Sequence, residues 1–435
     1  MDLPFACDTL DNGLDVLVHE DHRCPIVAVN VWYHVGSKNE RPGATGFAHL
    51  FEHLMFEGSA HYDRGYFHPL QEAGAALNGS TNADRTNYWE VVPSTALELA
   101  LWMESDRMGY LLPALSDAKF ANQRDVVLNE RRQNYENRPY GLATMALIGA
   151  LYPPDHPYHW LTIGAPDDLR AATLDDARAF LEAFYHPGNA SLALAGDVDA
   201  AQALELARAY FGEIPPGPAV APVTGLVPAP AGDTRLVLED RVELPRLYLA
   251  WHSPALFHDG DAELDLVADL LANGKTSRLY RSLVYKRRLA TEVAASQNSR
   301  ELSSFFQIVA TAAPGHALAE LDDAISVEVA RLQATGPEAG EMMRAGAQAE
   351  AHFLQRLQTV GGFGGKSDQL NAYNVYVGDP GYFARDFARY AHASTERLRA
   401  AAVSYLPVTR RVALSVVPLG QPALGLPGAA PVAVS

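Results

Sequence analysis

The sequence is short of cysteine and of positive charge, and both shortages exclude classes of protein. Only Cys7 and Cys24 occur among 435 residues, so neither a framework of several disulfides nor a four-cysteine zinc site can form. Acidic residues number 52 against 34 Lys and Arg, which gives a net charge of −18. This charge disfavours binding to nucleic-acid phosphates or to an anionic membrane surface. The sequence also has no run of about 18 apolar residues, so we expect no transmembrane helix.

The first residues lack the features of a secretory leader. Met1 to Phe5 contain neither the basic nor the apolar region of a signal peptide. We therefore expect a cytoplasmic protein with reduced thiols, or a periplasmic one if a leader has been removed. Apolar residues make up 48% of the chain and charged residues 20%, as in ordinary folded proteins. The length predicts two or three domains.

One segment rich in proline, alanine and glycine divides the chain. Residues 214–233 contain several prolines that cannot donate a backbone hydrogen bond, so an extended linker is expected there. We predict a first domain over 1–213, a linker over 214–233 and a second domain over 234–435.

The two halves show a similar order of patterns. The first half has a hairpin signal at Asn12-Gly13, a β-rich run at 25–33 and a helical pattern at 47–56. The second half has β-rich runs at 234–238 and 245–251 and a helical pattern at 261–272. Long helices, each opening with a serine cap, are predicted over 94–108 and 116–136. The mixture predicts an α+β fold in which one α/β unit is used twice.

The chemically most informative segment runs from Gly46 to Phe56. His49 and His53 are four residues apart, so on a helix both imidazoles share one face and can reach one cation. Glu52 lies on the same face and could accept a proton from a water molecule and return it to a leaving amine. The alternative is a buried helix with two incidental histidines, which would need compensating polar partners.

A third ligand is needed to complete a zinc site, and the second long helix offers one. Glu130 lies 77 positions after His53. Spacing alone cannot select it, because Asp125 and Glu136 lie nearby and a single Glu is more often part of a solvated helix face.

Together these motifs resemble the pitrilysin/insulysin family of zinc peptidases, which includes the mitochondrial processing peptidase. The resemblance rests on the inverted His-x-x-Glu-His motif and on the segment 124–130, and it extends to 77–82, 156–158 and 184–198. It implies two related α/β-layer halves of the mitochondrial processing peptidase type, with the zinc site in the first. It also implies one Zn²⁺ per chain, held by His49, His53 and Glu130, with Glu52 as the base.

The resemblance further implies a substrate edge. The segment Asn78-Gly79-Ser80 matches a strand to which the family adds a peptide as an extra strand, and Asn78 would orient the scissile carbonyl. A loop or strand-end asparagine is the alternative for Asn78 alone. Gln123 departs from the family pattern, which has an acid seven residues before the ligand Glu, so the zinc site is expected to be weaker or differently tuned.

A second departure lies in the C-terminal half. Active relatives supply an Arg and a Tyr seven residues apart, and the matching positions here are Val284 and Thr291. Neither side chain can replace its counterpart, so the chain is expected to need a related partner subunit that carries the pair. A local shift that lets Tyr285 or Arg287 substitute is the alternative.

The sequence thus predicts a zinc metalloendopeptidase subunit of peptidase family M16 that hydrolyses peptides or unfolded polypeptides as part of a heterodimer. A non-catalytic assembly subunit and a dedicated precursor-processing peptidase are the other hypotheses. No nucleic acid or membrane partner is expected. The glycine-rich run Gly361 to Lys366 is interpreted as a flexible substrate loop and lacks the context of a phosphate-binding loop.

Overall fold

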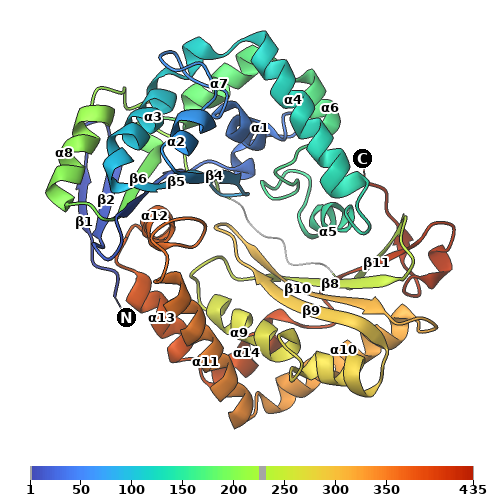
Figure 1. Cartoon of the computed structure of the whole chain (residues 1–435). Coiled ribbons are helices and arrows are strands. Elements are labelled where there is room, and N and C mark those ends of the chain that lie inside the picture. The colour runs from blue at the N-terminus through green and yellow to red at the C-terminus, as the bar shows by residue number, and fades with distance from the viewer. Residues whose placement is uncertain (1, 225–231, 435) are drawn as a thin grey trace. The chain divides into compact units, whose positions relative to one another are not determined.

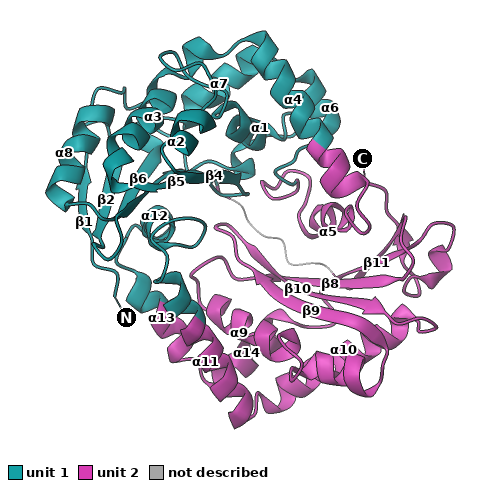
Figure 2. Cartoon of the chain, viewed as in Figure 1, with its two compact units in different colours: residues 1–129, 161–223, 352–386 teal, residues 130–160, 224–351, 387–435 magenta. Residues whose placement is uncertain are grey.

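The computed structural model describes residues 2–224 and 232–434, which form two compact units (Figures 1 and 2). Unit 1 combines residues 1–129, 161–223 and 352–386, and unit 2 combines residues 130–160, 224–351 and 387–435. Each unit therefore includes a segment from the opposite half of the sequence. This division differs from the sequence-based domains in 130–160 and 352–386. The predicted linker over 214–233 lies partly outside the described residues.

Unit 1 is built on a six-stranded mixed sheet in the order β1-β2-β6-β3-β5-β4. The strands are β1 (Ala6–Thr9), β2 (Asp15–Glu20), β3 (Ile26–Tyr33), β4 (Ala76–Thr81), β5 (Thr86–Pro93) and β6 (Ala190–Gly196). Only β2 and β6 pair in parallel. The hairpin predicted at Asn12-Gly13 is confirmed by the antiparallel β1–β2 pair, with Gly13 at φ 87°.

The helices of unit 1 come from three parts of the chain. They are α1 (Phe47–Leu54), α2 (Phe67–Glu72), α3 (Leu97–Tyr110), α4 (Asp117–Arg131), α6 (Pro166–Ala171), α7 (Leu174–Phe184), α8 (Ala200–Phe211) and α12 (Lys366–Val377). The division between the units falls within three helices: the last turn of α4, which continues into a π-helical turn over 132–136, the C-terminal part of α11 (Ala339–Arg356), and α13 (Phe383–Ala391). Ser116 caps α4 as predicted, with its Oγ accepting from Lys119 N at 3.3 Å. Ser94 instead opens a 3-10 turn and makes no cap hydrogen bond.

The two faces of the unit 1 sheet are covered by different parts of the chain. Alternate residues of a strand point to opposite faces. Val29, Val31 and Tyr33 of β3 are buried on the face that carries α1 and α3, whereas Trp32 of β3 donates to Asp368 of α12 at 2.9 Å. The helix α12, from the second half of the sequence, thus covers the opposite face (Figure 1).

Unit 2 repeats this plan. Its sheet has the order β12-β7-β11-β8-β10-β9, and again only the pairs that involve β7 are parallel. The strands are β7 (Thr234–Asp240), β8 (Arg246–Ser253), β9 (Ala290–Asn298), β10 (Ser304–Ala312), β11 (Val412–Pro418) and β12 (Ala430–Pro431). Five strands of each sheet correspond in order and direction, which confirms the predicted α+β architecture with one unit used twice.

The helices of unit 2 also come from both halves. They are α5 (Ala143–Leu151), α9 (Asp261–Ala272), α10 (Leu318–Thr335), α11 up to residue 351 and α14 (Thr395–Tyr405), with a π-helical turn over 280–286. The helix α5 from the first half packs on β8 and β11, and the adjoining Tyr152 donates to Ser303 O at 3.1 Å (Figure 2). Each sheet is therefore completed by a helix from the other half of the sequence. Among the described helices, none has both the length and the apolar character that crossing a bilayer requires.

Candidate metal centre

The helix α1 presents two faces because its apolar and polar residues follow the helical period. Phe47, Leu50, Phe51 and Leu54 are buried, while His49, Glu52 and His53 are half-buried on the other side. Phe51 stacks on Phe180 of α7 with the ring centroids 5.3 Å apart. The apolar face therefore fixes the orientation in which the polar face is presented.

The N-terminus of α1 is held by two devices. Gly46 adopts φ 89°, and a Cβ there would lie 3.1 Å from Gly164 Cα, so glycine is required. The carboxylate of Glu40 accepts hydrogen bonds from Gly46 N at 3.0 Å and from Ala48 N at 2.9 Å. A carboxylate here satisfies free helix donors and complements the helix dipole. Glu40 was missed by the sequence analysis, since no local pattern identifies a cap that comes from a preceding loop.

The structure brings the three predicted ligands together. One potential ligand atom from each of His49, His53 and Glu130 lies within 4.8 Å of the other two. This is the only such group of three or more His, Cys, Asp or Glu among residues 2–224 and 232–434. The imidazole rings of His49 and His53 are 4.9 Å apart and nearly perpendicular. The other acids considered, Asp125 and Glu136, are not in the group.

The chemistry of this donor set fits zinc. Zinc binds neutral imidazole nitrogens and carboxylate oxygens at about 2.0–2.2 Å. The three potential ligand atoms lie within 4.8 Å of one another, so a shift of less than about 1 Å in each would allow all three to bind one ion. Desolvation, and secondarily the neighbouring His53, lowers the pKa of His49 to about 4. His49 is therefore neutral near pH 7, the form in which it can bind a metal.

The charge of Glu52 acts on two buried phenols. Burial is the main cause that raises the pKa of Tyr88 and of Tyr185, and the Glu52 carboxylate raises both further. Tyr185 donates to Thr86 at 3.4 Å. Both phenols therefore stay protonated at neutral pH, and neither adds a negative charge near Glu52.

Gln123, which stands where the family has an acid, bonds to a carboxylate. Its Nε2 donates to Oε1 of Glu57. Glu57 comes four residues after the ligand His53, and Gln123 comes seven residues before the ligand Glu130. The bond therefore joins the two chain segments that carry the ligands. Position 123 therefore carries an amide that is bonded to the carboxylate of Glu57, a contact that was not predicted from the sequence.

The predicted substrate segment forms β4, the outermost strand of the unit 1 sheet. It pairs with β5 on one side, and no described strand pairs with its other side. Gly79 leaves little room for a side chain, because a Cβ there would lie 3.0 Å from the Phe56 ring. Asn78 is exposed, and its Oδ1 accepts from Gly79 N at 2.9 Å, while Ser80 donates to Asn87 at 2.7 Å.

The two departures in the second half occupy structural positions. Val284 packs against the hydrophobic core of unit 2, and Thr291 on β9 donates weakly to Thr311 O at 3.4 Å. Tyr285 is 75% exposed, and Arg287 is exposed as well. Val284 and Thr291 therefore present no Arg or Tyr chemistry.

Unit 2 has a helix in the place of α1 but without the metal motif. Like α1, α9 follows a glycine with positive φ, Gly260 at 96°. The residues three, six and seven positions after Gly46 are His49, Glu52 and His53. At the same positions after Gly260 stand Glu263, Leu266 and Val267. Leu266 and Val267 are buried in the core, and Glu263 accepts from Gly260 N at 3.1 Å.

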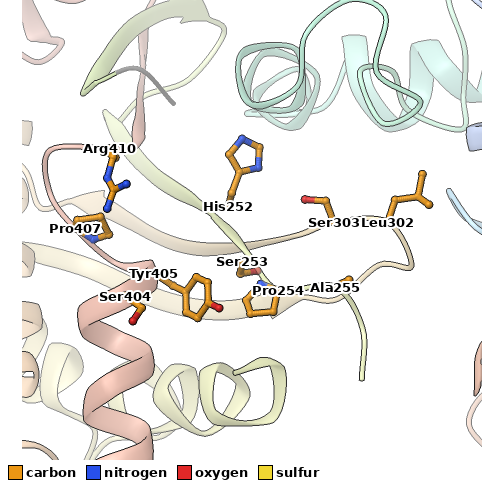
Figure 3. Close-up of a pocket in the computed structure, with 10 residues that line it drawn as sticks. All are labelled: His252, Ser253, Pro254, Ala255, Leu302, Ser303, Ser404, Tyr405, Pro407 and Arg410. Atoms are coloured by element: carbon orange, nitrogen blue, oxygen red, sulfur yellow. The ribbon is translucent and has the colours of Figure 1, made fainter. Parts of the chain in front are cut away.

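A cavity of about 360 Å³ in unit 2 does not provide an alternative metal site (Figure 3). Its lining includes the imidazole of His252 and the hydroxyl groups of Ser253, Ser404 and Tyr405, but no Asp, Glu or Cys. Burial lowers the pKa of His252 to about 4. One histidine cannot supply a three-residue ligand set, so the group on α1 and α4 remains the candidate metal site among the described residues.

Comparison with known proteins identifies the family. Residues 15–154 match the sequence profile described as insulinase (peptidase family M16), and residues 171–348 match the one described as peptidase M16 inactive domain. The zinc protease PqqE of Helicobacter pylori is 31% identical over 356 residues, which cover 81% of this chain and 80% of that protein. The chain belongs to peptidase family M16.

Other relatives place this M16 chain among zinc proteases of similar length. The uncharacterized zinc protease ML0855 of Mycobacterium leprae is 28% identical over 75% of this chain and 73% of its own. The crystal structure of a protease from Helicobacter pylori superimposes with a TM-score of 0.88 at 27% identity, covering 96% of this chain and all of that one. The periplasmic protease PqqL from Escherichia coli shares the fold (TM-score 0.77, 16% identity), but this chain covers only 49% of it.

Proposed function

We propose that this M16 chain is a zinc metalloendopeptidase subunit that hydrolyses peptides or unfolded polypeptides. The observation that carries the proposal is the approach of His49, His53 and Glu130 to within 4.8 Å of one another, two from α1 and one from α4. These three side chains would hold one zinc ion. Zinc, when bound, supplies Lewis-acid polarisation of the scissile carbonyl.

Glu52 is the proposed general base. It precedes His53 on the exposed side of α1, outside the ligand set. Its carboxylate takes a proton from the attacking water and returns it to the amine as the peptide bond breaks. The phenols of Tyr88 and Tyr185 stay protonated, because burial, and to a smaller degree the Glu52 charge, raises both pKa values.

The substrate is proposed to bind as a strand along β4. The outer edge of β4 offers backbone donors and acceptors to an extended chain, with little demand on side-chain identity. A folded domain has no extended segment free to pair in this way. We therefore expect peptides of roughly tens of residues to be cleaved and stable globular domains to resist.

The chain is further proposed to act with a related partner subunit. Val284 packs in the core and Thr291 bonds to its own sheet, so neither supplies the Arg and Tyr of active relatives. A partner that carries this pair would complete the site. In the PqqL protein, a single polypeptide of about twice this length contains the fold, which is compatible with a pairing of two such chains.

Metal analysis combined with hydrolysis of a quenched peptide tests the proposal. The purified chain should contain one zinc per molecule and should cleave the peptide when the partner is present. A non-catalytic assembly subunit would give no hydrolysis with any related partner. A dedicated precursor-processing enzyme would cleave one sequence of a peptide library and leave the rest intact.

A further inference from the structure

The glycine-rich loop that precedes α12 is built to lie close against the unit 1 sheet. A Cβ on Gly361 would lie 2.6 Å from both Ala28 Cβ and Val91 Cγ2, so only glycine fits there. Gly362 and Gly364 adopt φ of 79° and 74°, which other residues rarely adopt. These three glycines therefore set the loop's path across β3 and β5.

Hydrogen bonds fix the loop in this position. Gly364 N donates to Asp368 Oδ2 at 2.7 Å, and the other oxygen of this carboxylate accepts from Trp32 Nε1 at 2.9 Å and Asn87 Nδ2 at 3.1 Å. Gln369 donates to Gly364 O at 3.1 Å. The loop is thus tied to two strands and to its own helix, in contrast to the flexible loop expected from the glycine content alone.

This fixed loop holds an aromatic side chain in solvent. Phe363, between two glycines of positive φ, is 52% exposed. Its ring lies edge-to-face on Trp89 of β5, with the centroids 5.5 Å apart. A single exposed apolar residue is common on protein surfaces, but this one is held by a loop whose geometry requires glycine at three positions.

The aromatic pair lies next to the strand proposed to receive substrate. Trp89 is directly opposite Asn78 of β4, and opposite residues of paired strands share one face of a sheet. Asn78 is exposed and small. A peptide added outside β4 would direct every second side chain to this face, about two strand spacings or 10 Å from β5.

We propose that Phe363 and Trp89 form a subsite for one large apolar side chain of a peptide bound along β4. The inference rests on the proposed function, since it needs a peptide on that edge. The Phe363 ring and a long aliphatic or aromatic side chain meet above Asn78. Because the loop is already fixed, binding needs no ordering of Phe363.

The local charge favours an apolar residue over a basic one. Arg85 donates to Ser80 O of β4 at 2.9 Å, and its guanidinium lies 5.2 Å from the Trp32 ring centroid on the same face. A cation near the rings would be repelled by Arg85, while the Asp368 carboxylate on the same face is already shared among the donors Trp32 Nε1, Asn87 Nδ2 and Gly364 N. The subsite therefore selects Phe, Leu or Met over Lys or Arg.

A cleavage profile over a peptide library, measured with the zinc-loaded chain and its partner, tests the proposal. Wild type should favour a large apolar residue at one position, and Phe363→Ala should reduce kcat/KM for those peptides by roughly ten- to a hundredfold. Peptides with Gly or Asp at that position should be unaffected. Gly361→Ala, which keeps Phe363 but displaces the loop, should lose the same preference, and zinc content should stay at the wild-type value in both variants.

Leu354→Ala is the matched control, because Leu354 is 46% exposed and belongs to the same segment of unit 1. It should leave the profile unchanged. An unchanged profile in Phe363→Ala, a preference for basic residues, or an equal loss in Leu354→Ala would overturn the subsite. Absence of hydrolysis by wild type would instead overturn the proposed function. Binding of the same peptides to Glu52→Gln would then test the subsite separately. Weaker binding of apolar peptides to the double variant Glu52→Gln/Phe363→Ala would support the subsite, and equal binding would overturn it.

Discussion

Replacement of Arg107 by Met should destabilise unit 1 more than any surface change of similar size. Arg107 and Glu104 on α3 are buried, with side chains 1% and 0% exposed. Arg107 Nε donates to Glu104 Oε2 at 2.8 Å, and the guanidinium lies 3.9 Å from the Tyr66 ring centroid and 4.1 Å from that of Tyr88. The substitution removes the cation and leaves the Glu104 carboxylate buried.

The expected cost follows from these contacts. Removing one partner of a buried ion pair costs about 3–5 kcal/mol, and desolvated cation–π contacts contribute about 2 kcal/mol more. The two terms do not add in full, because both count the loss of the same cation. The remaining Glu104 carboxylate lies near Glu90, whose pKa is raised by burial and then by the Glu104 charge. We expect a net loss of about 3–5 kcal/mol, or roughly 6–20 °C in Tm for a unit of this size.

Differential scanning calorimetry of Arg107→Met, Glu104→Gln and the double variant measures the effect. The double variant removes both charges, so it should recover most of the loss. Zinc affinity gives a second readout, because Tyr88 packs against Phe56, which directly follows the metal helix. A loss below about 1 kcal/mol in Arg107→Met, or a double variant no more stable than the single one, would refute this reasoning.

Three further outcomes are expected. His53→Ala and Glu130→Ala should each lose the zinc, measured by plasma mass spectrometry, and full occupancy in both would contradict the ligand assignment. Burial raises the pKa of Asp265 to about 7, so the folded state keeps a proton that the unfolded state loses near pH 4. The free energy of unfolding should therefore fall between about pH 4 and 7 by up to roughly 4 kcal/mol. In pH-dependent melting, Asp265→Asn should remove that fall, and an unchanged pH profile would be evidence against it. The zinc-loaded chain alone should hydrolyse peptide about 10²–10³-fold more slowly than with its partner; robust turnover by the lone chain, abolished by Arg287→Ala, would favour the local substitution instead.

The local parts of the fold could be predicted from the sequence because their signals are local. The period of α1 and the i, i+4 spacing of His49 and His53 lie within ten residues, and the β1–β2 hairpin follows from Asn12-Gly13. The helix predicted at 261–272 has the bounds of α9. Gly46 and Gly260 open corresponding helices, which agrees with the repeated unit inferred from pattern order.

The long-range parts could not be predicted in this way. The helices α5 and α12 have no local feature that assigns them to the sheet of the other half, since that choice depends on contacts such as Trp32 with Asp368 across more than 300 residues. The bond from Gln123 to Glu57 also joins segments that only the fold brings together. The Glu40 cap on α1 is close in sequence, but it depends on the path of the loop between Glu40 and Gly46. The selection of Glu130 over Asp125 rested on resemblance, because both lie on one polar helix.

The comparison of wild type with Glu52→Gln at equal zinc content tests the central claim most directly. Glutamine keeps the size of the side chain and lies outside the proposed ligand set, so the zinc site should be retained. Hydrolysis of a quenched peptide, measured with the partner present, should fall by roughly 10²–10⁴-fold, the range for loss of a general base. Turnover at the wild-type rate with zinc fully bound would contradict the assignment of Glu52 and with it the proposed peptidase mechanism.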